Sequence, residues 1–111
     1  MIIKVKQQEK YTSVIIAERE ASLKNAEAFK TEMMQLVDTG ATNMILNFSQ
    51  VTYVDSSFLG SLVASLKYAI SKGSDIYLVE LQKDIYDLLH LIRMNKVFKI
   101  FDSEEQAVAS L

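Results

Sequence analysis

The distribution of apolar and polar residues along the chain predicts short strands that alternate with longer helices. Two β-branched segments flank a polar break at residues 7–10 and predict an antiparallel hairpin. An apolar run at residues 43–48 predicts a strand that is covered on both faces of its sheet. The predicted strands are residues 2–6, 14–17, 43–48, 75–81 and 96–101.

Helices are predicted where apolar residues recur at spacings of three and four, because these positions share one face of a helix. Asn25 is the expected cap of the first helix, and Gly40 and Gly73 are expected to end the first and the second. Ser103 with Gln106 predicts a capping box for the last helix. The apolar stripes are Ala26, Phe29, Met33, Leu36 and Val37; Leu59, Leu62, Val63, Leu66 and Ile70; Ile85, Leu88, Leu89 and Ile92; and Ala107, Val108 and Leu111.

The order of these elements predicts the fold class. An opening hairpin followed by repeated strand–helix units is typical of an α/β fold with a mixed sheet and helices packed against it. The chain of 111 residues has the size of one domain, so residues 1–111 are expected to form it. Periodicity alone does not decide whether the helices lie in one layer or in two.

The segment between the central strand and the second helix carries the residues with the clearest chemical role. Asp55, Ser56 and Ser57 stand where this helix begins, and all three are of the types that cap helices. Unpaired backbone N–H groups and the positive end of the helix dipole meet there, so the place accommodates a negative charge. The spacing leaves two interpretations open: the residues only cap the helix, or Ser56 is also positioned to carry a phosphate.

Composition excludes several classes of function. Twelve basic and fourteen acidic residues give a net charge of -2, which leaves no basic surface for binding nucleic acid. No apolar run approaches the ~20 residues that span a bilayer, and the N-terminus lacks the apolar core of a signal peptide. We therefore expect a cytoplasmic protein without membrane insertion. Cysteine is absent, which excludes disulfides and thiolate metal sites.

Enzymatic chemistry is disfavoured by the same sequence. His90 is the only histidine and has no cysteine partner for a metal, so we expect neither a metal nor a cofactor. Ser-His-Asp catalysis would require Ser56 or Ser57 to pair with His90, but the chain has no Gly-x-Ser-x-Gly elbow and no Gly-rich phosphate loop. A small serine hydrolase with Ser56 as nucleophile is therefore the weakest alternative, and we expect no catalytic residues.

The segment Val54-Asp55-Ser56-Ser57-Phe58-Leu59-Gly60 resembles the hydrophobic-Asp-Ser-Ser/Thr-Gly-Leu-Gly motif of STAS domains, the family of bacterial anti-sigma factor antagonists. The similarity continues through residues 73–79 and 94–107. The resemblance implies a single layer of about four helices packed against a mixed sheet of about five strands.

The resemblance also implies a mechanism. A dephosphorylated antagonist binds an anti-sigma factor that is a GHKL-type serine kinase, which frees a sigma factor and so regulates transcription. The kinase uses ATP to phosphorylate the serine after the motif's aspartate, and a PP2C-type phosphatase removes the phosphate. By this resemblance Ser56 is the phosphorylation site and Ser57 the alternative. Asp55 would position or cap the start of the helix by hydrogen bonding. It could also accept the proton of the serine hydroxyl during the transfer.

The sequence departs from the family pattern at two places. Phe58 replaces the motif's glycine and is expected to be exposed beside the phosphorylation site as a partner contact. In the polar loop before the first helix, residues 19–26 resemble the family stretch Gly-Glu-Ile-Asp-Leu-x-Asn-Ala, with Arg19 for the glycine and Ser22 for the aspartate. These changes leave open an unphosphorylated STAS adaptor in a signalling or transporter complex. The expected partner-binding residues are Asp55, Ser56, Ser57, Phe58, Glu20, Ser22 and Asn25.

Overall fold

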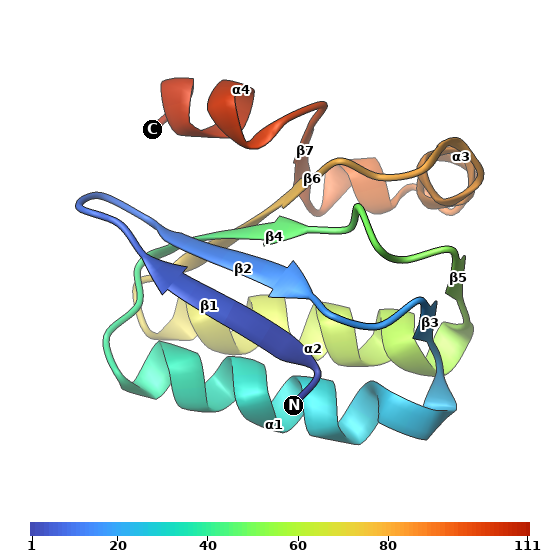
Figure 1. The fold of residues 1–111 in the computed structure, drawn as a ribbon, viewed down its shortest axis with the longest axis horizontal. Coiled ribbons are helices and arrows are strands. Elements are labelled where there is room, and N and C mark those ends of the chain that lie inside the picture. Colours follow the sequence, from blue (N-terminus) through green and yellow to red (C-terminus); the bar gives the residue numbers. More distant parts are fainter.

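The computed structural model describes residues 1–111 and shows the strands and helices in the predicted order (Figure 1). The main sheet consists of β1 (Ile3–Gln7), β2 (Thr12–Ile16), β4 (Asn43–Asn47), β6 (Asp75–Val79) and β7 (Lys99–Phe101). The helices are α1 (Leu23–Asp38), α2 (Ser56–Ser71), α3 (Lys83–Leu91) and α4 (Glu104–Ala109), with the 3-10 helix η1 (Met94–Lys96). None of the helices has the length and hydropathy that crossing a membrane requires.

The main sheet is mixed and has the strand order β1-β2-β4-β6-β7. β1 runs antiparallel to β2, as the hairpin pattern predicted, whereas β2–β4, β4–β6 and β6–β7 are parallel pairs. The connection between the strands of each parallel pair contains a helix, which is the usual way to return the chain to the same end of a sheet. The predicted α/β class with a mixed sheet is therefore confirmed.

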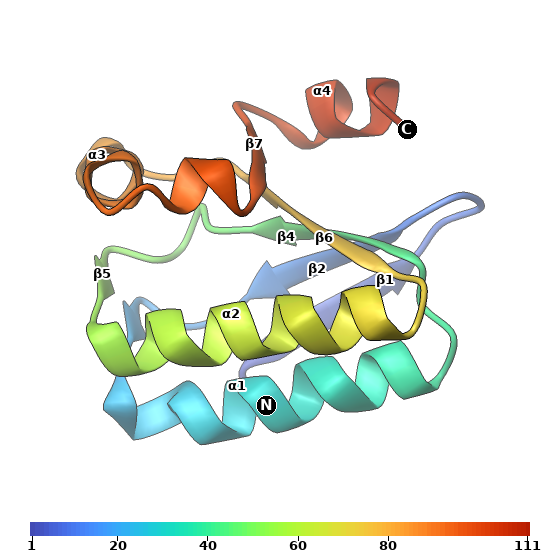
Figure 2. The same cartoon turned by 180° about the vertical axis from the view of Figure 1, so that it is seen from behind.

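The two faces of the sheet are covered by different helices (Figures 1 and 2). Leu46 and Leu78 belong to the large core that includes side chains of α1, α2 and α3. Ile45 and Tyr77 point to the other face, where they cluster with Ala107 of α4. The single helix layer implied by the resemblance is therefore wrong for this chain, because the chain crosses to the opposite face after β7. β4 and β6 are covered on both faces, as the apolar run at residues 43–48 predicted for β4.

The inward face of α2 differs from the predicted stripe. Its buried apolar residues are Phe58, Leu62, Leu66 and Ala69. These positions share one face of the helix, so Leu59 is only partly buried beside it and Ile70 is 58% exposed. Ile92 and Leu111 are also exposed, contrary to prediction, because each lies beyond the last residue of its helix.

Candidate functional site

A second, very short sheet brings together the two loops that precede α1 and α2. β3 (Glu20–Ala21) pairs in parallel with β5 (Tyr53–Val54). The Asp55 amide extends this pairing by donating to the Ala21 carbonyl oxygen at 3.1 Å. The starts of α1 and α2 therefore lie side by side at one end of the molecule (Figure 1, right). Strands of two residues are too short to show an alternating pattern, so the sequence predicts only a polar loop here.

One carboxylate joins the two helix starts. Asp55 is the N-cap of α2, and its Oδ1 accepts the Phe58 N–H at 2.9 Å. Its Oδ2 accepts the N–H of Leu23, the first residue of α1, also at 2.9 Å. These hydrogen bonds, first that from Phe58 and then that from Leu23, stabilise the ionised form and hold the pKa of Asp55 below its ordinary value. Asp55 thus caps α2 and also links α1 to α2. The sequence indicated a capping residue here but not the link to α1.

The two candidate hydroxyls differ in their exposure. Ser56 is the first residue of α2 and is exposed to solvent. Ser57 is partly buried and lines a groove of about 360 Å³ between α1 and α2. Of the two serines, Ser56 is therefore the more open to solvent.

Phe58 does not take the position expected from the sequence. Its side chain is fully buried, and its ring centroid lies 4.6 Å from that of Phe29 on α1, with the ring planes tilted by 41°. The expectation of an exposed partner contact is therefore wrong. The third position of α2 faces the core, and the ring that replaces the family's glycine fills space between the two helices instead of covering Ser56.

Hydrogen bonds between polar groups of the loop before α1 and the first turn of α1 hold this loop in place. Ser22 is the N-cap of α1 and forms a capping box with Asn25. Asn25 Oδ1 accepts the Ser22 N–H at 2.9 Å, and Asn25 Nδ2 donates to the Glu20 carbonyl oxygen at 2.7 Å. The prediction that Asn25 is the cap is wrong, because Ser22 holds that place. Ser22 and Asn25 are buried, so Glu20 is the exposed member of the three expected loop contacts.

Two exposed apolar side chains at this end of the molecule were missed by the sequence argument. Leu23 is 73% exposed at the first position of α1, and Tyr53 is 53% exposed on β5. The only signal for Tyr53 is its alternation with buried Val54, and a single step of alternation cannot be distinguished from chance. Leu23 and Tyr53 supply the apolar contact area at this surface that the sequence had assigned to Phe58.

His90 is not paired with either serine. Its Nδ1–H donates to the Tyr86 carbonyl oxygen at 3.0 Å, and its ring centroid lies 4.1 Å from the Tyr86 ring centroid. Both residues belong to α3, so the ring is engaged on its own helix. No three histidine, cysteine, aspartate or glutamate side chains are grouped so that they could hold a metal ion.

Comparison with known proteins adds to this geometry. The profile of the STAS domain matches residues 3–107. A protein of Thermotoga maritima, named as a candidate anti-sigma factor antagonist, is 27% identical over 96 residues, which are 86% of this chain and 85% of that protein. A crystal structure of a Thermotoga maritima protein with the same description has a TM-score of 0.85 at 25% identity, and the match covers 97% of this chain and 92% of the other.

The chain therefore belongs to the STAS domain family. The same fold is found in the phosphorylated form of SpoIIAA, a cell fate determinant of Bacillus. That structure has a TM-score of 0.72 at 15% identity, and the match covers 97% of each chain.

Proposed function

We propose that this chain is a phosphorylation-controlled anti-sigma factor antagonist of the cytoplasm, with residues 1–111 forming one STAS domain. When dephosphorylated, its Ser56 surface binds an anti-sigma factor that is a GHKL-type serine kinase, and the sigma factor held by that kinase is released for transcription. Phosphorylation of Ser56 ends the contact. A PP2C-type phosphatase restores it.

The observation that carries this proposal is the exposure of Ser56 at the first position of α2, directly after Asp55. Ser56 lies at the positive end of the α2 dipole, with the start of α1 beside it, so we expect a phosphate there to be accommodated without refolding. The phosphorylated form in which SpoIIAA was solved supports the proposal, since the two proteins share a fold.

The transfer joins Ser56 Oγ to the γ-phosphorus of ATP held by the kinase. The Oγ–P bond forms while the bond from the γ-phosphorus to the β,γ-bridging oxygen breaks, and ADP leaves. The hydroxyl proton passes to a base. Asp55 suits that role poorly, because both of its oxygens accept backbone N–H groups and its pKa is lowered. We assign Asp55 a positioning role and the proton to a base of the kinase.

The added phosphate changes the surface rather than the fold. It brings a charge of about -1.5 to -2 beside Asp55 and within reach of a partner that covers Leu23 and Tyr53. Such a partner would have to desolvate the dianion or face it with like charge, so the contact is lost. Because Phe58 is buried, its ring does not block the approach of the kinase to Ser56.

An unphosphorylated STAS adaptor is the second candidate function. Ser22 replaces the aspartate of the family pattern and is buried as a helix cap, so this chain presents a less acidic loop next to Ser56. A partner that recognises such a loop without phosphorylating Ser56 would make the chain a constitutive binding module.

Phosphate mapping tests the proposal directly. The full chain is incubated with ATP and a GHKL-type anti-sigma factor kinase from the same genome, and its intact mass is measured. We expect one added phosphate on the wild type, none on Ser56→Ala, and one on the matched control Ser57→Ala. Modification that is lost only in Ser57→Ala would contradict the assignment. Stable kinase binding without any modification would favour the adaptor.

A further inference from the structure

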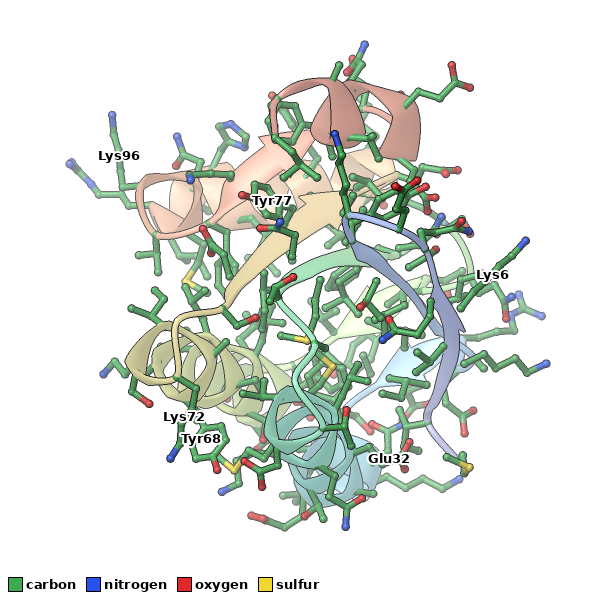
Figure 3. All side chains as sticks on the ribbon, turned by 90° about the vertical axis from the view of Figure 1, so that its left-hand side faces the viewer. Lys6, Glu32, Tyr68, Lys72, Tyr77 and Lys96 are labelled. Carbon is green, nitrogen blue, oxygen red and sulfur yellow. The ribbon has the colours of Figure 1, made fainter.

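The main sheet has two outer strands, β1 and β7, and they differ in how their edges are protected. An outer strand presents unpaired backbone N–H and C=O groups, and charged side chains along it oppose pairing with another strand. Lys4 and Lys6 are exposed along β1, and Glu32 of α1 accepts the amides of Ile2 and Ile3 at 3.0 and 3.1 Å. Figure 3 shows Lys6 and Glu32 on this protected side of the molecule.

The edge of β7 lacks this protection. Its only lysine, Lys99, is directed back over the neighbouring strand β6, where its Nζ lies 3.4 Å from Asp75 Oδ2 and 5.3 Å from the centroid of the Tyr77 ring. β7 instead borders a groove of about 540 Å³, which Tyr86 and His90 of α3 also line. Figure 2 shows β7 and η1 between α3 and α4.

Basic residues outnumber acidic residues around this groove. Arg93, Lys96 and Lys99 lie within residues 88–101, which contain no acidic residue, and Asp102 is the one acidic residue that lines the groove. Arg93 and Lys96 are exposed, and so are the neighbouring apolar side chains Leu91, at 80%, and Val97, at 51%. Figure 3 shows Lys96 on the side of the molecule opposite Lys6. The surface therefore complements a segment that combines acidic and apolar residues.

We propose that the groove beside β7 binds an extended acidic segment of a partner protein, which adds to the main sheet as a strand. The backbone of the segment would pair with the unpaired groups of β7, and its alternate side chains would meet the basic residues Arg93 and Lys96 and the apolar surface at Val97. A short strand with an open edge, a lined groove and a local excess of basic residues together fit this partner.

This second contact is independent of the switch at Ser56. The β7 groove and the α1–α2 groove that Ser57 lines share no residue. The domain can therefore keep one protein bound at β7 while a second protein binds to its Ser56 surface and dissociates from it.

A displayed library of random short peptides, selected on the immobilised full chain, tests the proposal, with binding of the enriched peptides measured by fluorescence anisotropy. We expect enriched peptides that alternate acidic with β-branched or aromatic residues. Lys96→Glu should weaken their binding about tenfold, whereas Lys6→Glu, the matched change at the other edge, should not alter it. Ser56→Asp should also leave binding unchanged, which separates this contact from the proposed switch.

Backbone pairing is tested with N-methylated versions of the enriched peptides. Methyl groups on alternate residues should abolish binding in one register and be tolerated in the other, because only every second N–H of a strand faces its neighbour. The proposal is overturned if no acidic peptide is enriched, if Lys96→Glu binds as well as the wild type, or if both methylation patterns are tolerated. Binding to phosphatidylserine vesicles that Lys96→Glu abolishes, without peptide binding, would overturn it in favour of a lipid surface.

Discussion

The starts of α1 and α2 lie side by side and each carries a serine, yet the two serines are used differently. Ser22 is buried, caps α1 with its own side chain, and donates its amide to Asn25. Ser56 comes one position after the cap, which is Asp55, and is exposed to solvent. Capping and modification compete for the same hydroxyl. A serine that is open to a kinase therefore needs a neighbour that takes over the cap.

The largest effect is expected from removing the buried ring of Phe58, which packs between α1 and α2. Phe58→Ala should lower the free energy of unfolding by ~3–5 kcal/mol, because it removes a fully buried ring that contacts Phe29 and leaves a cavity. Urea unfolding followed by circular dichroism measures the change. Tyr53→Ala removes an exposed ring nearby and should stay within ~0.5 kcal/mol of the wild type. Equal effects of the two substitutions would contradict the placement of Phe58 in the core.

A smaller effect on stability is expected from removing the Asp55 carboxylate, which links the two helix starts. Asp55→Ala leaves the amides of Phe58 and Leu23 without their acceptor and should lower the urea midpoint by less than Phe58→Ala but by more than Ser22→Ala. Asp55→Asn keeps a capping side chain and should recover part of the loss.

The contribution of Asp55 to the stability of the fold should decrease as the pH is lowered. Its folded pKa is lowered from an ordinary value of 3.8, so the ionised carboxylate stabilises the fold at any pH above that value and loses this contribution as the pH falls through the folded pKa. The difference in urea midpoint between wild type and Asp55→Ala should be constant near neutral pH and shrink below about pH 4. A difference that grows in acid would refute the hydrogen-bonding account of Asp55.

The smallest effects are expected from the alanine substitutions that compare the two serines directly. Ser22→Ala removes a helix cap and should cost about 1 kcal/mol of unfolding free energy. Ser56→Ala changes an exposed residue and should stay within ~0.5 kcal/mol of the wild type. Both are measured by urea unfolding under the same conditions. A larger loss in Ser56→Ala than in Ser22→Ala would mean that Ser56 is the structural cap and that the roles are reversed.

The sequence was informative where the signal is local. The residue types at Asp55 and Ser56 predicted a helix start, and α2 begins at Ser56. The apolar stripe of α1 was correct for Ala26, Phe29, Met33 and Val37, which are all buried. Spacing and capping chemistry act within a few residues, so they can be seen without the fold.

The errors lie where tertiary contacts decide. Phe58 was expected at the surface because it replaces the motif's glycine beside the phosphorylation site, but the phase of α2 turns it inward onto Phe29. The pairing of β3 with β5, and the bond from Leu23 to Asp55, join residues far apart in the chain. Such contacts leave no periodic trace, so the tie between the helix starts could not be predicted.

The most direct test compares the phosphorylated and unphosphorylated full chain from one preparation. Kinase binding is measured by titration calorimetry, and stability by the urea midpoint of each form. The account predicts that binding falls by at least about a hundredfold, a loss typical of burying an unmatched charge, while the urea midpoint stays unchanged. Phosphorylated chain that binds as tightly as before, or that unfolds at a much lower urea concentration, would contradict it.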